Sequence, residues 1–101
     1  MRVIIFYDLP SISYTERRAY IKFHRFLEDE GFIQMQESVY SKLAINSSVS
    51  KSVVQRVKSN SPKKGVVQLL VVTEKQYAQI EYICGSSSNN KIDTEDRLII
   101  L

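Results

Sequence analysis

The sequence predicts an α+β fold: one ferredoxin-like domain over residues 1–101, in the order βαββαβ, with an extra C-terminal strand. Two runs rich in branched apolar residues, Arg2–Leu9 and Val66–Val72, are typical of buried strands. Two further segments repeat their apolar residues at helical spacing, and each comes after a predicted strand. A chain of 101 residues has room for one domain with a modest core.

The first predicted strand contains the most distinctive short stretch, "IIFYDLP". The run Arg2–Leu9 is almost unbroken in apolarity, which predicts a central strand buried on both faces. Pro10 cannot donate a ladder hydrogen bond and restricts the residue before it, so the strand should end there. Asp8 therefore places a lone carboxylate at the end of a buried strand.

The segment Ser13–Glu30 has the pattern of a helix. Ser13 and Glu16 have the spacing of a capping box, although Thr15 is an alternative cap. Gly31 follows at the position where a helix end favours a positive φ angle. The last turn is acidic ("EDE"), which opposes the helix dipole, and the sequence offers no local explanation for it. The apolar stripe of this helix consists of Ala19, Tyr20, Phe23, Phe26 and Leu27.

The middle of the chain predicts further strand and then a second helix. The segment Phe32–Ile45 alternates loosely between apolar and polar residues, with a bend or bulge near Glu37. It predicts two short strands or one kinked strand. The polar turn "NSSVS" then precedes a helix that ends near Lys58. The expected inner stripe of that helix is Val49, Val53, Val54 and Val57.

The last third begins with a basic connector, "SNSPKKG". The run Val66–Val72 follows as a second candidate for a central strand. Thr73 is expected to cap a short helix that ends near Gln79. The remaining expected elements are a brief strand at Tyr82–Cys84, a flexible loop at Gly85–Lys91 and a short strand at Arg97–Leu101, within the segment 92–101.

This order of elements predicts a homodimer. Both helices would cover one face of a four-stranded sheet and leave the other face without a cover. Because the two predicted central strands are apolar on both faces, a second copy of the chain is the most economical cover. The C-terminal strand, which contains "DRLII", would then pair across the dimer or with a partner protein.

The distribution of charge points to phosphate groups as a partner. The formal net charge is only +3, but the span from Ser38 to Thr73 holds six basic residues and no acidic ones. Such a span predicts a positive face that meets phosphates, with a solvated lysine-rich surface as the alternative. The candidate phosphate contacts are Arg17, Arg18, Lys63 and Lys64, followed by Arg56 and Lys58.

Several other classes of protein are disfavoured by the sequence. No apolar run is long enough to cross a bilayer, no signal pattern opens the chain, and the single Cys84 excludes an internal disulfide. These features favour the cytoplasm and no membrane partner. There is no glycine-rich phosphate loop, and "VVQLLVV" lacks the aromatic signature of an RNA-recognition motif. His24 is expected on the surface without an orienting partner, and Cys84 as a small packed side chain.

Asp8 allows three interpretations. Its carboxylate could accept backbone hydrogen bonds in the turn before Pro10, or it could form an ion pair with Arg17 or Arg18. Alternatively, a twofold axis near the strand ends would bring two Asp8 carboxylates together around a cation. Oxygen ligands of this kind select Mg²⁺, with Mn²⁺ as an alternative, and such an ion can polarise a phosphodiester and activate water.

The motifs taken together resemble the family of CRISPR-associated protein two, in particular the short versions that accompany type II systems. The matching segments run the length of the chain in order: "IIFYDLP", "ERRAY", "SVYSKL", "PKKG", "VTEKQ" and "EDRLIIL". The resemblance implies a ferredoxin-like homodimer that bridges two dimers of the CRISPR integrase, protein one, in a heterohexamer. That complex binds double-stranded spacer-precursor DNA during spacer acquisition.

The resemblance also implies a catalytic activity. The family is described as metal-dependent endonucleases that cut RNA or DNA, in which the first-strand aspartate of each protomer binds Mg²⁺. Asp8 is the matching residue here and is the expected metal ligand and catalytic residue. The segment Ile92–Leu101 matches the strand that crosses to the partner sheet or meets the integrase. The alternative function is a small dimeric adaptor or scaffold without catalytic activity.

Overall fold

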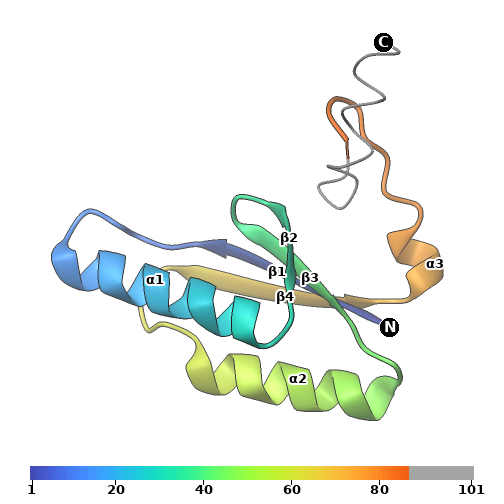
Figure 1. Cartoon of the computed structure of the whole chain (residues 1–101), viewed down its shortest axis with the longest axis horizontal. Coiled ribbons are helices and arrows are strands. Elements are labelled where there is room, and N and C mark those ends of the chain that lie inside the picture. Colours follow the sequence, from blue (N-terminus) through green and yellow to red (C-terminus); the bar gives the residue numbers. More distant parts are fainter. Residues whose placement is uncertain (87–101) are drawn as a thin grey trace.

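The computed structural model describes residues 1–86 and has the predicted βαββαβ order followed by a short third helix (Figure 1). The elements are β1 (Arg2–Asp8), α1 (Tyr14–Asp29), β2 (Ile33–Gln36), β3 (Val39–Leu43), α2 (Ser47–Asn60), β4 (Val66–Val72) and α3 (Glu74–Tyr77). The strand expected at 97–101 and most of the loop expected at 85–91 lie outside the described residues. None of the helices in residues 1–86 has the length and hydropathy required to span a membrane.

The sheet is antiparallel, with the strand order β2-β3-β1-β4, so β1 and β3 are its inner strands. Alternation along β1 places Val3, Ile5 and Tyr7 on one face, where they share a core with Phe23 of α1 and Val53 of α2. Both long helices therefore pack against the same face of the sheet (Figure 1). The predicted α+β, ferredoxin-like architecture and the central position of β1 are confirmed.

The prediction of a second central strand at Val66–Val72 is wrong, because β4 is the outermost strand of the sheet that residues 1–86 form. In the sheet that the structure describes, β4 pairs with β1 alone, and Val66 and Leu70 are 55% and 51% exposed. The side chains of its other face pack against the helix-side core: Val67, Leu69 and Val71. An uninterrupted apolar run does not distinguish a central strand from an edge strand whose outer face is also apolar.

The sheet face away from the two long helices is rich in apolar side chains, several of which are exposed. We call it the open face, and it is formed by alternate residues of all four strands: Ile4, Phe6, Ile33, Val39, Leu43 and Leu70. Leu43 and Leu70 are each about half exposed, at 53% and 51%. Ile4, in the middle of this face, is only 7% exposed, so the exposure is greatest towards the outer residues. The cover of this face stays a prediction.

α1 begins as the sequence predicts. The Ser13 hydroxyl accepts a hydrogen bond from the Glu16 backbone N–H at 3.1 Å, and the Glu16 carboxylate accepts one from the Ser13 N–H at 3.0 Å. This capping box is confirmed, and Thr15 is not the cap. Gly31 follows the helix with a φ of 93°, also as expected.

The middle of the chain forms two strands, with a register shift between Gln34 and Gln36 next to the turn at Glu37. α2 then runs two residues beyond Lys58, to Asn60. Its inner stripe differs from the prediction at one turn, because Val49 is 37% exposed and Ser50 is buried instead. Val53 and Val57 are buried as expected, and Val54 is partly buried.

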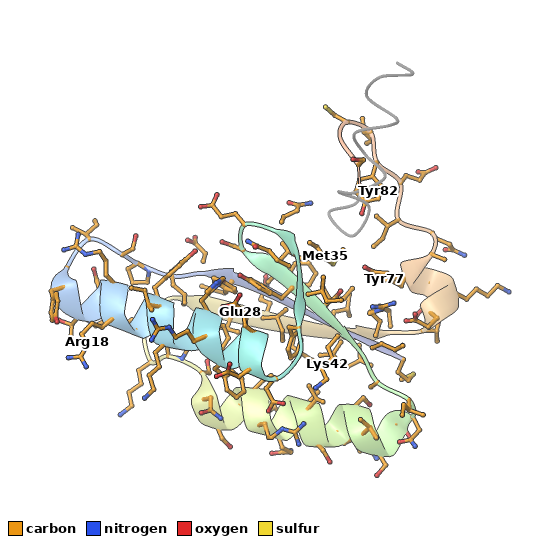
Figure 2. All side chains as sticks on the ribbon, viewed as in Figure 1. Arg18, Glu28, Met35, Lys42, Tyr77 and Tyr82 are labelled. Atoms are coloured by element: carbon orange, nitrogen blue, oxygen red, sulfur yellow. The ribbon has the colours of Figure 1, made fainter. Side chains whose placement is uncertain are left out.

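α3 is fixed to the start of β1 by charge and aromatic contacts. Thr73 caps it as predicted, and the Arg2 guanidinium makes two hydrogen bonds to the Glu74 carboxylate, at 3.0 and 2.7 Å. The same guanidinium lies 4.2 Å from the ring centre of Tyr77. Tyr77 is labelled on α3 in Figure 2. The brief strand expected at Tyr82–Cys84 is absent, and Cys84 is exposed, so both predictions about this segment are wrong.

Tertiary contacts explain the acidic end of α1. The Glu30 carboxylate accepts a hydrogen bond from Arg56 Nε at 2.5 Å and lies 3.8 Å from Lys42 Nζ, which also donates to the Glu30 carbonyl. Two cations from other elements therefore offset the unfavourable interaction of this carboxylate with the helix dipole. Lys42 is labelled on β3 in Figure 2.

His24 has two orienting partners, so the expectation that it has none is wrong. Its Nδ1 shares a short hydrogen bond of 2.5 Å with the Tyr40 hydroxyl, and its Nε2 lies 3.2 Å from the Glu28 carboxylate. Glu28 lies one turn from His24 on the same helix, a spacing that the sequence shows, whereas Tyr40 comes from β3 and is brought to His24 only by the fold. The three residues tie the middle of α1 to the sheet.

Candidate nucleic-acid interface

Asp8 is exposed at the C-terminal end of β1. Among residues 1–86, its carboxylate forms no hydrogen bond and no ion pair, so neither the turn interpretation nor the ion pair with Arg17 or Arg18 is realised in the described part of the chain. Alternation along β1 places Asp8 in the same set of positions as Ile4 and Phe6, on the side of the open face.

A hollow of about 480 Å³ lies beside Asp8 and brings together residues from three segments. Arg17 of α1 and Glu37 of the β2–β3 turn line it together with Asp8, and Ser11 and Ser38 contribute hydroxyl groups. One arginine and two carboxylate-bearing residues thus line the same hollow. Such an arrangement offers a bidentate donor for phosphate and oxygen ligands for a cation.

Glu37 is a residue of this hollow that the sequence pattern does not reveal. The pattern marks Glu37 only as the position of a bend, whereas antiparallel pairing of β1 with β3 returns this turn to the end of β1. The backbone N–H of Tyr7 donates to the Ser38 carbonyl at 3.0 Å, which fixes the turn next to Asp8. Only the order of the strands in the sheet indicates that Glu37 lies near Asp8, and no local sequence motif does so.

The lysine loop, Pro62–Gly65, packs against the same end of β1. Gly65 has a φ of 90°, and a Cβ added there would lie 2.7 Å from the Asp8 carbonyl oxygen and 2.9 Å from Leu9 Cδ2. This close approach holds Lys63 and Lys64, both exposed, beside the turn that follows Asp8. The connector after α2 and the end of β1 therefore form one surface.

A second hollow, of about 350 Å³, lies between the lysine loop and the start of α1. Leu9, Pro10 and Tyr20 are among the residues that line it, with Lys63 and Lys64 on the loop side. Hydrogen bonds from the Ser13 segment lower the pKa of the nearby Glu16 carboxyl, and the charge of Lys64 lowers it further. The Glu16 carboxylate caps α1 and forms no ion pair with Lys63 or Lys64 among residues 1–86. Both exposed lysines can therefore contact a partner.

The other basic candidates lie apart from Asp8. Arg18 lies over the Tyr14 ring, 5.8 Å from its centre, and lines a different hollow from Arg17. Arg56 is bound to Glu30 at the opposite end of α1, so a phosphate at Arg56 would compete with that ion pair. Lys58 is exposed on α2 and has no ion pair within residues 1–86.

The tyrosines near Asp8 belong to the core. Tyr7 packs edge-on to Phe23, with 5.4 Å between ring centres, and lies parallel to Tyr40 at 5.9 Å. Burial raises the pKa of the Tyr7 hydroxyl far above its ordinary value and also raises that of Tyr40. A buried phenol with a raised pKa stays protonated at neutral pH, so Tyr7 is a structural neighbour of Asp8 and not a general base.

The donor set at this strand end suits a hydrated divalent cation. Asp8 and Glu37 supply carboxylate oxygens to one hollow, and Mg²⁺ commonly uses one or two carboxylates while it keeps several waters. Residues 1–86 contain no group of three or more His, Cys, Asp or Glu side chains placed to hold a metal. An ion here would therefore depend on water, on substrate oxygens or on a second protomer, and Mg²⁺ stays a prediction.

The fold and the polar strand end define a small ferredoxin-like domain with its candidate site where the first strand ends. The chain belongs to the family of CRISPR associated protein Cas2, whose family model matches residues 1–80. The resemblance seen in the sequence is thereby confirmed.

Known proteins similar to this chain support that assignment. A protein of Treponema denticola, named CRISPR-associated endoribonuclease Cas2, is 46% identical over 101 residues, which covers all of both chains. A protein of the same name from Streptococcus mutans serotype c is also 46% identical, over all of this chain and 93% of its own. The crystal structure of Streptococcus pyogenes Cas2 at pH 6.5 has a TM-score of 0.61 and covers 83% of this chain and 100% of its own. At 14% identity it supports the fold alone.

A prediction about stability follows from the close approach at Gly65. The Gly65→Ala variant should lose about 2–4 kcal/mol of unfolding free energy. A positive φ is unfavourable for alanine, and the added methyl group would clash with the Asp8 carbonyl oxygen. Urea denaturation of both proteins measures this loss.

Gly31→Ala is the matched control for this prediction. The φ of Gly31 is 93°, but the atom nearest to an added Cβ is the flexible end of Lys42 at 3.8 Å. The Gly31→Ala variant should therefore lose only the free energy that a positive φ costs alanine. Equal losses in the two variants would contradict a tight contact between the lysine loop and the end of β1.

Proposed function

We propose that this chain is a nucleic-acid-binding scaffold of CRISPR spacer acquisition, which acts as a homodimer in the cytoplasm. The homodimer would bridge two dimers of the CRISPR integrase in a heterohexamer and bind spacer-precursor duplex DNA. The single observation that carries the proposal is the gathering of Arg17, Lys63 and Lys64 at the end of β1 by two segments far apart in the sequence. Exposed cations of this kind contact phosphates without reading base sequence.

The open face supports the dimeric form of the proposal. Leu43, Val66 and Leu70 are each about half exposed on this face, and a second copy would remove their apolar surface from water. Asp8 lies at the end of β1 on the same side of the sheet, so a twofold axis that passes near the strand ends would bring the Asp8 carboxylates of two protomers towards one another. RNA remains an alternative partner, because both nucleic acids present phosphate groups to exposed cations.

A second candidate function is Mg²⁺-dependent cleavage of a phosphodiester bond, with Mn²⁺ as an alternative ion. The observation that favours it is the exposed Asp8 carboxylate, without a partner in residues 1–86, in a hollow with Glu37 and Arg17. The ion would polarise the phosphate and activate a water. Asp8 would hold the ion, and Arg17 would hold the phosphate. The name endoribonuclease carried by the relatives supports this candidate.

The salt dependence of duplex binding tests the scaffold. Wild-type protein should bind a short DNA duplex of any sequence, with an affinity that falls linearly on a double-logarithmic plot against salt. The Lys63→Gln/Lys64→Gln variant should reduce the slope of that plot by about 2, since each lost phosphate contact removes about 0.9. Fluorescence anisotropy with a labelled duplex measures both quantities.

Lys51→Gln/Lys75→Gln is the matched control for this experiment. It removes the same charge from exposed lysines on α2 and α3 that have no ion pair within residues 1–86. The control should keep the wild-type slope. A wild-type protein that fails to bind duplex even at low salt would reject the scaffold and leave the adaptor without nucleic-acid contact.

A further inference from the structure

The outer face of α1 carries three basic residues that lie along one side of the helix. Arg18, Lys22 and Arg25 recur at helical spacing, are exposed, and line one open hollow of about 660 Å³. None of the three forms an ion pair within residues 1–86, where the ion pairs involve Arg2, His24, Lys42 and Arg56. Arg18 is labelled at the start of this face in Figure 2.

The dimensions of this face match a nucleic-acid backbone. Seven residues separate Arg18 from Arg25, which is about 10 Å along a helix that rises 1.5 Å per residue. Along the duplex axis, the phosphates of one strand rise about 3.4 Å per nucleotide. With α1 parallel to that axis, the three cations would lie beside about three phosphates. Like charges three and four residues apart repel one another on a helix, and a polyanion lying along them would remove this repulsion.

Arg17 connects this face to the strand end already described. Arg17 lines the Asp8 hollow, whereas Arg18, the next residue, lines the hollow on the outer face. Asp29 lies at the far end of the same hollow, where its negative charge would end the favourable contact. The cationic surface therefore begins at the end of β1 and ends before the last turn of α1.

We propose that Arg18, Lys22 and Arg25, which we call the α1 track, form a second contact for the sugar-phosphate backbone of a bound duplex. The proposal rests on the scaffold function and extends it, since it names the helix face along which the duplex continues from the lysine loop. Lys22 and Arg25 are not among the phosphate contacts that the sequence predicts. The alternative is a solvent-exposed charged face that binds no ligand and serves only to keep the protein soluble.

The Lys22→Gln/Arg25→Gln variant tests the α1 track in the full chain. It should bind a labelled duplex about tenfold more weakly at low salt, and its salt slope should fall by about 2 relative to wild type. The control Lys51→Gln/Lys75→Gln has the same net charge and should keep the wild-type slope. Thermal unfolding of both variants should show that the fold is kept, because all four side chains are exposed.

The outcomes separate this inference from the function on which it rests. If wild type binds duplex and the Lys22→Gln/Arg25→Gln variant keeps the wild-type affinity and slope, the α1 track is rejected and the scaffold stands. If the control weakens binding as much, the effect is one of net charge and the track is also rejected. If wild type binds no duplex at all, both the scaffold and the track fail.

Discussion

The Asp8→Asn variant should lose Mg²⁺-dependent phosphodiester cleavage by at least about a hundredfold while it keeps the wild-type affinity for duplex DNA. Asparagine preserves the size of the side chain but removes the negative charge that would hold the ion. Duplex binding depends instead on Arg17, Lys63 and Lys64, which the substitution leaves in place. Cleavage of labelled RNA and DNA is measured with Mg²⁺, Mn²⁺ and a chelator, beside anisotropy for binding.

Glu81→Gln is the matched control for the loss of one exposed carboxylate, because Glu81 lies outside the Asp8 hollow. It should cleave as wild type does. Glu37→Gln should have a smaller defect than Asp8→Asn if Glu37 holds the ion through water. Should highly purified Asp8→Asn protein cleave as fast as wild type, the hydrolysis would come from a contaminant and the chain would be a scaffold only.

The Leu70→Glu variant should raise the dissociation constant of the homodimer by at least about a hundredfold. Leu70 is 51% exposed on the edge strand β4, next to Ile4 on the open face, so a charge there costs little in the isolated subunit. In an apolar interface the same carboxylate loses its hydration without gaining a partner, which is costly. Light scattering at micromolar concentration measures the change in mass.

Ile45→Glu provides the control for the dimer experiment. Ile45 is 88% exposed and lies between β3 and α2, outside the sheet, so its replacement should leave the mass unchanged. A Leu70→Glu protein that stays dimeric would show that another surface joins the subunits. A stable wild-type monomer would remove the basis for pairing two Asp8 carboxylates.

The sequence was sufficient for features that depend on local patterns. The capping box of Ser13 and Glu16, the end of β1 after Asp8 and the cap at Thr73 all follow from residues within a few positions of one another. The order of elements followed from the alternation of strand and helix periods, and that order selected the ferredoxin-like fold. The basic residues of the lysine loop were likewise visible as a run of charge.

Features that depend on long-range pairing could not be predicted in this way. The edge position of β4, the return of Glu37 to Asp8 and the contact of Glu30 with Arg56 each join segments that only the folded sheet brings together. His24 was misjudged for the same reason, since its partner Tyr40 lies on another element. A hydrophobic pattern records which side chains avoid water but not which neighbour covers them.

The contact between Gly65 and the Asp8 carbonyl has a practical consequence for engineering. A mutagenesis library that aims to change nucleic-acid preference should randomise positions 63 and 64 and keep position 65 invariant. Variants that replace the glycine would fail through displacement of the loop, and screening would discard useful neighbouring substitutions together with them.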